Sequence, residues 1–392
     1  MDGRQDGNSD IERLEPARPA VRRQAADGPA RRFWSVNGDF VAFAPNGVAR
    51  YAREVTLALD RLIAQDHPLA RGLKVELVAP RASALPLEAI AVRIVPEFSR
   101  PRLPQFWVQV QLPRHVQGGL LSFCNLAPVL VKRQIVCIHD LHTRLMPESY
   151  GFGFRLAHRI ILPLLGRRAA RITTVSQLSR QHLAGHRIAA EDRITVTYNG
   201  SDHVERWNAW HSNLQVPARR GYVLCLGQTQ RYKNVEILLR LCPLLQAMGL
   251  EMWMAGDVDR QALSRLVAPL PENLRLLGRI SDHDLKKALR GALCFLFPSR
   301  IEGFGLPAVE AMRAGCPVVA STAPCLPEVC GEAALYADPD DLDGWASAIS
   351  DIERKPSLRA QLSEAGRRKS RDYSWRTIAE IYLKLMAEVD GI

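Results

Sequence analysis

Short aliphatic runs alternate with longer amphipathic stretches over most of this chain. In the first half, "FVAFAPNG" (40–47) is a candidate strand that leads into a helix from about Val48, and "QIVCIHD" (134–140) is a later candidate strand. A second series starts at "YVLCLG" (222–227) and continues through "CFLFPS" (294–299). This alternation is typical of βαβ units, in which strands form a parallel sheet covered by helices. We therefore expect an α/β fold of two doubly wound Rossmann-like domains, facing a central cleft at the carboxyl ends of their strands.

The length of 392 residues suits two domains of roughly 150 to 200 residues each. The N-terminal residues mix charges with Ala, Pro and Gly without periodicity, which is typical of a flexible tail. A stretch after Gly200 also lacks a period and suits a linker. The expected segments are a tail at 1–30, an N-terminal domain at 31–200, a linker at 201–220, a C-terminal domain at 221–372, and a C-terminal helix at 373–392 that crosses back to the N-terminal domain.

The charge balance and the cysteines narrow the partners and the compartment. Fifty-two Lys and Arg against 41 Asp and Glu give a net charge of +11, which favours a nucleotide, nucleic acid or anionic lipid as partner. The eight cysteines form no CxxC pair and lie mostly in apolar runs, which indicates reduced thiols. The chain begins "MDGRQDGNSD", without an apolar signal core, and no run approaches the ~20 apolar residues of a membrane span. We therefore expect a cytoplasmic protein.

The stretch "RIEGFGLPAVEA" (300–311) combines two acids with a glycine turn. It follows a predicted strand, and its glycines and proline indicate a turn that opens a short helix, with Glu310 in the first turn. Free N–H groups and the dipole at such a helix start attract phosphate, while carboxylates accept hydrogen bonds from hydroxyls. The combination therefore suits a nucleotide sugar. For either acid alone the simpler interpretation is that Glu310 completes the helix start and Glu302 is a solvated loop acid.

Several segments resemble family 4 of the retaining glycosyltransferases of the GT-B fold. The stretch from Phe297 to Ser321, "FPSRIEGFGLPAVEAMRAGCPVVAS", resembles the acid-x7-acid signature of that family. Further resemblances lie at "NGVARYAREV" (46–55), at 122–150, at "LGQTQRYKN" (226–234) and at "LPEVCGEAALYADPDD" (326–341). The resemblance implies an N-terminal domain on the acceptor side and a C-terminal domain that binds the nucleotide sugar.

The resemblance also implies roles for residues of the C-terminal domain. Glu302 would face the donor sugar hydroxyls and Glu310 would hold the ribose diol. Arg231 and Lys233 would bind the diphosphate, whose charge grows as the glycosidic bond breaks and needs fixed cations. This chain has Tyr232 between those two bases, where the family commonly has adjacent Arg and Lys. The backbone N–H groups offered to the diphosphate and the sugar would belong to Phe304, Gly305 and Leu306.

In the N-terminal domain the resemblance implies two further donor contacts. His139, at the end of a predicted strand, would lie beside the donor sugar, and Gly47 would close over the donor from the opposite domain. Without the resemblance, a lone His at a strand end is more often a structural hydrogen-bonding residue. Asp140 is expected to fix a local turn, and His142 is a weaker candidate than His139.

The resemblance implies hexosyl transfer with retained anomeric configuration, by front-face attack in which the departing phosphate oxygen takes the acceptor proton. We expect neither a metal nor another cofactor, because the sequence has no His/Cys cluster poised for a metal and "DPDD" (338–341) lies at a predicted helix start, where Asp acts as a cap. Likeness to bacterial surface-polysaccharide mannosyltransferases favours GDP-mannose as donor. UDP-glucose or another hexose donor, and a non-catalytic protein that only binds a nucleotide sugar, are the alternatives. We see neither a nucleic-acid-recognition motif nor the GxGxxG of a nicotinamide-dependent oxidoreductase.

Residues 151–190 contain seven Arg and no Asp or Glu, interleaved with Leu, Ile and Phe. A helix around 153–168 would carry a basic, apolar-rich surface that can rest on anionic lipid headgroups. We therefore expect a glycan or polyprenyl-diphosphate-linked acceptor and peripheral association with the inner membrane face. The equally weighted alternative is that the apolar face of this helix is core and its Arg side chains are solvated.

Overall fold

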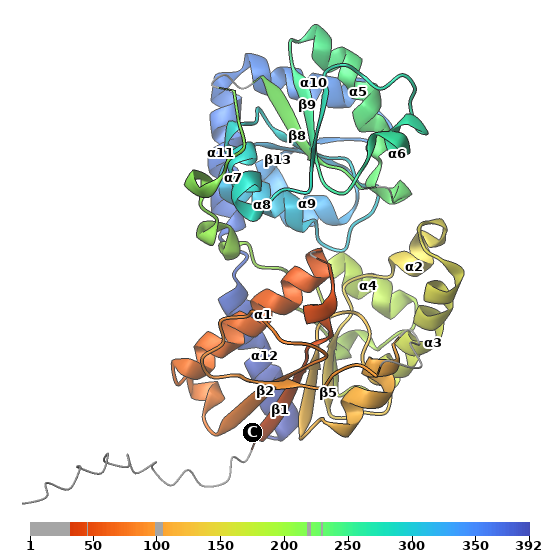
Figure 1. The fold of residues 1–392 in the computed structure, drawn as a ribbon, viewed down its shortest axis with the longest axis vertical. Helices are drawn as coiled ribbons and strands as arrows, with labels where there is room; N and C mark the ends of the chain where they lie inside the picture. The colour runs from red at the N-terminus through yellow and green to blue at the C-terminus, as the bar shows by residue number, and fades with distance from the viewer. Residues whose placement is uncertain (1–31, 45, 99–104, 218–220, 229) are drawn as a thin grey trace, which may run out of the picture.

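The chain folds into two α/β units, one above the other in Figure 1. This computed structural model describes residues 32–44, 46–98, 105–217, 221–228 and 230–392. The predicted tail at 1–30 lies outside the described residues.

The N-terminal unit is built on a parallel sheet with the strand order β3-β2-β1-β4-β5-β6-β7. The order runs outward in both directions from β1 and β4, so the adjacent loops diverge at the carboxyl ends of these strands, where doubly wound sheets bind ligands. The strands are β1 (Arg32–Asn37), β2 (Leu73–Ala79), β3 (Ala91–Ile94), β4 (Gly119–Ser122), β5 (Gln134–Cys137), β6 (Arg171–Thr174) and β7 (Ile194–Val196).

The first strand is not where the sequence predicted it. The prediction placed it at 40–47, whereas β1 ends at Asn37 and Asp39–Ala42 is a 3-10 turn. Only glycine fits at position 38, between this strand and the turn, because a Cβ there would lie 2.6 Å from the carbonyl oxygen of Val78. Phe40 is apolar because it is buried in the core, not because it belongs to a strand.

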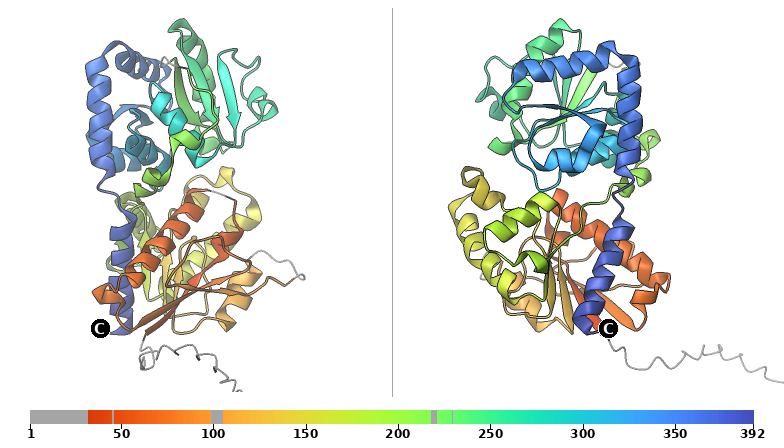
Figure 2. Two further views of the ribbon diagram at one scale, coloured as in Figure 1. Left: turned by 60° about the vertical axis from the view of Figure 1, so that its left-hand side comes forward. Right: turned by 180° about the vertical axis from the view of Figure 1, so that it is seen from behind.

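Helices cover both faces of the first sheet (Figure 2). The helix predicted from about Val48 is α1, which starts at Gly47 with Asn46 as its cap. The helices of this unit are α1 (Gly47–Ala64), α2 (His142–Leu145), α3 (Phe152–Arg168) and α4 (Gln177–Gly185), with short 3-10 or π turns at Pro68–Ala70, Trp107–Gln111, Leu112–Arg114, Pro147–Ser149 and Glu191–Arg193.

The C-terminal unit has a second parallel sheet, in the order β10-β9-β8-β11-β12-β13. Its strands are β8 (Tyr222–Leu226), β9 (Glu251–Ala255), β10 (Leu274–Gly278), β11 (Phe295–Phe297), β12 (Val318–Ser321) and β13 (Ala334–Ala337). Its helices are α5 (Val235–Ala247), α6 (Arg260–Ser264), α7 (Asp282–Gly291), α8 (Leu306–Ala314), α9 (Cys325–Cys330), α10 (Leu342–Arg354) and α11 (Pro356–Ser370), with 3-10 turns at Arg231–Lys233 and Gly331–Ala333. The predicted alternation of strands and helices is confirmed here.

Two segments cross between the units and lie side by side (Figures 1 and 2). The first contains the 3-10 turns Asp202–Arg206 and Ala209–His211, and the second leads into α12 (Trp375–Asp390), which packs beside α1 of the N-terminal unit. Where they meet, the N–H of Ser201 donates to the carbonyl of Tyr373 at 2.9 Å, and Asp202 accepts from the N–H of Trp375 at 2.9 Å.

Buried polar groups fasten α12 to the first sheet. The Tyr382 hydroxyl lies 2.9 Å from the Tyr51 hydroxyl and 2.7 Å from the Thr173 hydroxyl. At the far end of α12, Asp390 accepts from Arg32 at 2.5 Å. The last helix therefore belongs structurally to the N-terminal unit. All eight cysteine side chains are buried, and no helix within the described residues is long and apolar enough to cross a membrane.

Candidate active site

The glycine turn after β11 delivers the start of α8 to the edge of its sheet. Gly305 has φ +94°, and a Cβ there would lie 2.6 Å from Leu326 Cδ2, so both backbone and packing require glycine. The helix begins at Leu306 and ends at Ala314, and Gly315 caps it with φ +81°. The N–H groups of Phe304, Gly305 and Leu306 donate no hydrogen bond to any described residue. Three donors without a partner among the described residues therefore lie at the positive end of the α8 dipole, which is the arrangement that an anion cradle needs.

Lys233 and Glu302 form an ion pair next to this cradle. Lys233 Nζ lies 2.6 Å from Glu302 Oε1, and both side chains are largely buried. The ammonium also lies 5.8 Å from the centroid of the Phe297 ring. The carboxylate, packing and cation–π attraction therefore hold Lys233 at a defined position.

Arg231 and Tyr232 have different environments. The Arg231 side chain is exposed and makes no ion pair with a described residue. Tyr232 is buried and packs against the N-terminal unit, with its ring nearly parallel to Tyr150 at 6.5 Å and 5.1 Å from His142. Burial, together with the nearby Asp140, raises the pKa of Tyr150 to about 12, so its hydroxyl keeps its proton near neutral pH. Tyr232, which lies between Arg231 and Lys233 in the sequence, thus forms a contact between the two units.

Glu310 lies in the second turn of α8, not in the first turn as predicted. The helix already begins at Leu306, so Glu310 is its fifth residue. Glu310 is buried, and its Oε1 accepts from His203 Nε2 at 2.9 Å. The interpretation that it merely completes a helix start is therefore wrong.

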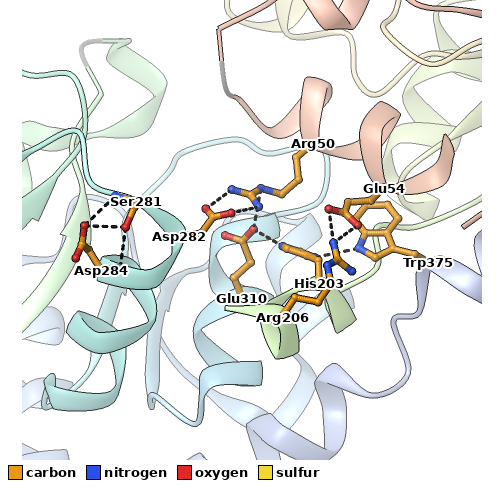
Figure 3. A network of polar contacts seen from close by, with 9 residues as sticks. All are labelled: Arg50, Glu54, His203, Arg206, Ser281, Asp282, Asp284, Glu310 and Trp375. Carbon is orange, nitrogen blue, oxygen red and sulfur yellow. Dashed lines mark hydrogen bonds and ion pairs between the residues drawn. The ribbon is translucent and has the colours of Figure 1, made fainter. Parts of the chain in front are cut away.

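Arg50 of α1 joins this acid from the opposite unit (Figure 3). Its Nε lies 3.4 Å from Glu310 Oε1, and its two terminal nitrogens donate to the oxygens of Asp282 at 2.9 and 2.7 Å. Burial of Asp282 opposes its ionisation, but the hydrogen bonds and charge of Arg50 outweigh burial and lower the pKa of Asp282. The guanidinium also lies 5.3 Å from the Trp207 ring. Arg50 therefore bridges the two units at Glu310.

His139 lies at the end of β5 and faces the glycine turn. Its Nε2 donates to the carbonyl of Phe123 at 2.7 Å, and its ring packs edge-on against Tyr51. Its carbonyl oxygen is 3.0 Å from the place where a Cβ of Gly303 would lie. The structure thus brings the backbone of His139 next to Gly303 and engages the His139 side chain in a structural hydrogen bond. Asp140 accepts from the N–H of His142 at 2.9 Å and fixes the expected local turn.

Gly47 is exposed at the first position of α1. A Cβ added there would meet no atom within 4 Å, so the fold itself does not require glycine at this position.

A second contact between the units involves Glu328 of α9. Its carboxylate accepts from the N–H groups of Gln177 at 2.7 Å and Leu178 at 3.1 Å, at the start of α4. Nearby, the Ser179 hydroxyl donates to the carbonyl of Gly303 at 3.3 Å. The two units are therefore clasped at Arg50 and at Glu328. A surface hollow of about 490 Å³ lies elsewhere, lined by residues that include Arg171, Thr195 and Lys384.

The sequence analysis missed Arg50, Asp282 and His203. Arg50 lies one turn after Gly47 within "NGVARYAREV", so its place near the donor residues could have been suspected. His203 lies in the segment predicted to be a linker, where nothing in the local pattern marks it. No cluster of three or more His, Cys, Asp or Glu in the described residues is arranged to hold a metal ion.

Comparisons with known proteins agree with this arrangement. The family profile "Glycosyltransferase Family 4" matches residues 45–205, and the profile "Glycosyl transferases group 1" matches residues 208–369. The chain is 31% identical to O-antigen chain mannosyltransferase B of Escherichia coli over 265 residues, which cover 63% of this chain and 68% of that protein. It is 27% identical to O-antigen chain mannosyltransferase RfbU of Salmonella typhimurium over 230 residues, 58% of this chain and 63% of that protein.

Among solved structures, the fold is similar to sucrose-phosphate synthase from Thermosynechococcus elongatus, with a TM-score of 0.70 at 18% identity. That similarity covers 91% of this chain and all of the other one. It extends over both α/β units.

Proposed function

We propose, from the premise that this chain belongs to the family 4 glycosyltransferases of the GT-B fold, that it transfers mannose from GDP-mannose to a glycan or polyprenyl-diphosphate-linked acceptor. Relatives named O-antigen chain mannosyltransferases, at 31% and 27% identity, support the choice of sugar. UDP-glucose or another hexose nucleotide remains the alternative donor, and a protein that binds the donor without transferring it is the alternative activity.

One observation carries the proposal: three unpaired N–H groups at the start of α8 lie beside the Lys233–Glu302 pair. A nucleoside diphosphate at this cradle would replace Glu302 as the partner of Lys233. Glu302, released from that ion pair, would then accept hydrogen bonds from hydroxyls of the donor sugar. Glu310, in the second turn of α8, would accept hydrogen bonds from the two hydroxyls of the ribose.

In the proposed reaction an acceptor oxygen attacks the anomeric carbon on the face that the phosphate leaves. The bond from the anomeric carbon to the phosphate oxygen breaks, that oxygen takes the proton of the acceptor hydroxyl, and the configuration is retained. Negative charge then grows on the diphosphate. Lys233, the exposed Arg231 and the dipole of α8 supply fixed positive charge for it, so we propose that the enzyme needs no metal.

We propose that the donor enters when the two units separate at the Arg50 and Glu328 contacts. Arg50 and Glu328 join the two units close to α8, through Glu310 and through the start of α4. Gly47, at the start of α1, would approach the bound donor on closure. The fold leaves the space beside Gly47 open for such an approach, because a Cβ there would meet no atom within 4 Å.

The decisive experiment incubates the full chain with GDP-mannose, UDP-glucose and other nucleotide hexoses, with polyprenyl-diphosphate-linked glycans as acceptors and with EDTA in parallel. We expect mannosylated product and GDP release, unchanged by EDTA, and a loss of roughly 10²- to 10³-fold in Lys233→Ala. Binding of GDP-mannose without product from any acceptor, and without hydrolysis, would favour the non-catalytic alternative. Activity that EDTA abolishes and Mn²⁺ restores would contradict the proposed role of the cations.

A row of exposed apolar side chains on α3 supports the proposed membrane association. Phe152, Leu156, Ile160 and Leu164 are spaced by four residues, so they share one face, and each is exposed, Phe152 by 72% and Ile160 by 54%. The opposite face, with Leu162 and Leu165, is buried in the core. The alternative that the apolar residues of this helix are all core is thus wrong for this row.

Charge on the same segment points to an anionic lipid surface. Residues 151–190 include no Asp or Glu, and Arg159 and Arg167 are exposed at positions that flank the apolar row. We propose that this face of α3 rests on the inner membrane surface and brings the active site to a lipid-linked acceptor. Flotation with vesicles of anionic and of zwitterionic lipid tests this. We expect binding to anionic vesicles at low salt, lost in Leu156→Glu/Ile160→Glu and kept in the control Leu266→Glu, an exposed leucine of the C-terminal unit.

A further inference from the structure

A chain of hydrogen bonds connects the C-terminal helix to Glu310 (Figure 3). The indole Nε1 of Trp375 donates to His203 Nδ1 at 2.9 Å, and His203 Nε2 lies 2.9 Å from Glu310 Oε1. An indole N–H can only donate, so Nδ1 must be the acceptor. In the neutral ring the hydrogen therefore lies on Nε2, which donates to the carboxylate. Trp375 thus selects the tautomer of His203 that Glu310 requires.

Burial makes this arrangement rigid. His203 is 0% exposed, Trp375 2% and Glu310 5%. Water does not reach these groups, so it cannot replace a hydrogen bond that is broken. A buried donor without its acceptor costs free energy, and the His203 ring is therefore confined to this orientation. Arg50 Nε approaches the same carboxylate oxygen, Oε1, at 3.4 Å. No described residue donates a hydrogen bond to Oε2 of Glu310.

We propose that His203 is a positioning residue that holds Oε1 of Glu310 and leaves Oε2 to accept from the ribose diol of the donor, with Trp375 fixing the tautomer of His203. This rests on the proposed function, in which Glu310 binds the ribose. The assignment explains why a histidine is buried in the segment that crosses between the units. It also gives the contact between the two crossing segments a chemical role at the donor site.

Contacts between the two crossing segments hold Trp375 in the position from which it donates to His203. A Cβ at Gly200 would lie 2.5 Å from the backbone nitrogen of Trp375, so glycine permits the two segments to touch. Asp202 holds the same nitrogen, and the rings of His203 and Trp207 pack edge-to-face at 5.3 Å. The competing explanation is that His203 only fills the core here. The test must therefore separate ribose recognition from packing.

The experiment measures binding of GDP and of 2′,3′-dideoxy-GDP to the full chain by calorimetry, with UDP and 2′,3′-dideoxy-UDP as a second pair. The ratio of the two dissociation constants reports ribose recognition, because the nucleotides differ only in the hydroxyls that Glu310 would bind. Hydrogen bonds to a charged group predict a ratio of roughly 10 to 100 in the wild type. The variants are His203→Ala, His203→Gln, Trp375→Phe and Glu310→Ala. The control is His211→Ala, an exposed histidine of the same segment.

We expect the ratio to fall roughly tenfold in His203→Ala and in Glu310→Ala, with no further fall when the two are combined. His203→Gln keeps an N–H near the position of Nε2 and should keep the ratio within about threefold of wild type, with Trp375→Phe intermediate. If His203→Ala weakens both nucleotides equally, His203 only fills the core and the inference is wrong. If the wild type binds both nucleotides equally, Glu310 does not bind ribose, and the proposed donor geometry fails together with the inference. Should His203→Ala not fold, the His203→Gln and Trp375→Phe ratios decide.

Discussion

Replacement of Gly305 by alanine tests whether the turn before α8 is packed as described. Two effects combine at this position. The first is backbone strain, because φ is +94° and left-handed geometry costs an L-residue ~1–2 kcal/mol. The second is a clash, because the new Cβ would lie 2.6 Å from Leu326 Cδ2, whereas ordinary van der Waals contact begins at 3.4 Å. Overpacking of a buried site costs ~1–3 kcal/mol.

The sum is a loss of about 2–5 kcal/mol in the free energy of unfolding of the C-terminal unit. Gly249→Ala is the matched control, because Gly249 has φ +71° but a Cβ there meets no atom within 4 Å. It isolates the backbone strain, so we expect a loss of only ~1–2 kcal/mol. At ~2–4 °C per kcal/mol for a unit of this size, the thermal midpoint should fall by about 4–20 °C in Gly305→Ala and by about 2–8 °C in the control.

Urea and thermal unfolding, followed by circular dichroism, measure both variants. The difference between them is the cost of the clash with Leu326. Equal losses in the two variants would refute the close packing at Gly305. A loss below about 1 kcal/mol in both would refute the strain argument as well.

Three further changes have outcomes that follow from the contacts described. Tyr382→Phe removes a hydroxyl bonded to Tyr51 and Thr173 inside the N-terminal unit, and we expect about 1–2 kcal/mol of lost stability in urea unfolding; no loss would show that this network does not hold α12. Glu328→Ala removes the clasp at the start of α4, and small-angle scattering should show a more extended chain, whereas an unchanged radius of gyration would mean that the clasp does not hold the units together. Burial raises the pKa of Asp39 from 3.8 to about 7 in the folded state, so between these pH values the folded chain holds a proton that the unfolded chain has released. The free energy of unfolding therefore falls by up to ~4 kcal/mol as the pH rises through this range, and Asp39→Asn should remove that slope in unfolding titrations at pH 4 to 8; a slope that persists would assign it to other groups.

Local features of the fold were predictable because they depend on neighbouring residues. Gly305 and Gly315 mark the two ends of α8, since each adopts a positive φ that other residues avoid. Asp341 caps α10 by accepting from the N–H of Gly344 at 3.0 Å, as expected of an Asp at a helix start. The first strand was misplaced because two apolar runs, 32–37 and 40–44, are adjacent in the sequence. Only the packing of the folded chain determines that the first is a strand and that the second contains a buried turn.

The contacts of Glu310 were not predictable, because they join residues that are far apart in the sequence. His203 is 107 positions from Glu310, and Trp375 is 172 positions from His203. Arg50 is 232 positions from Asp282. The sequence around each of these residues does not indicate its partners. The crossing segments and the approach of the two units bring the partners together. The sequence of the glycine turn predicts the cradle, but only the fold identifies what holds the acid beside it.

The exposed row on α3 illustrates the same limit. Both faces of this helix carry leucine or isoleucine, so the sequence predicts the helix but not which face meets the core. Packing of Leu162 and Leu165 against the first sheet decides it.

A crystal structure of the full chain with GDP-mannose tests the central claim most directly. It should show the diphosphate against Lys233 and the N–H groups of residues 304–306, the ribose hydroxyls on Glu310 Oε2, and mannose hydroxyls on Glu302. A nucleotide bound away from the start of α8, or one whose ribose does not contact Glu310, would contradict this account.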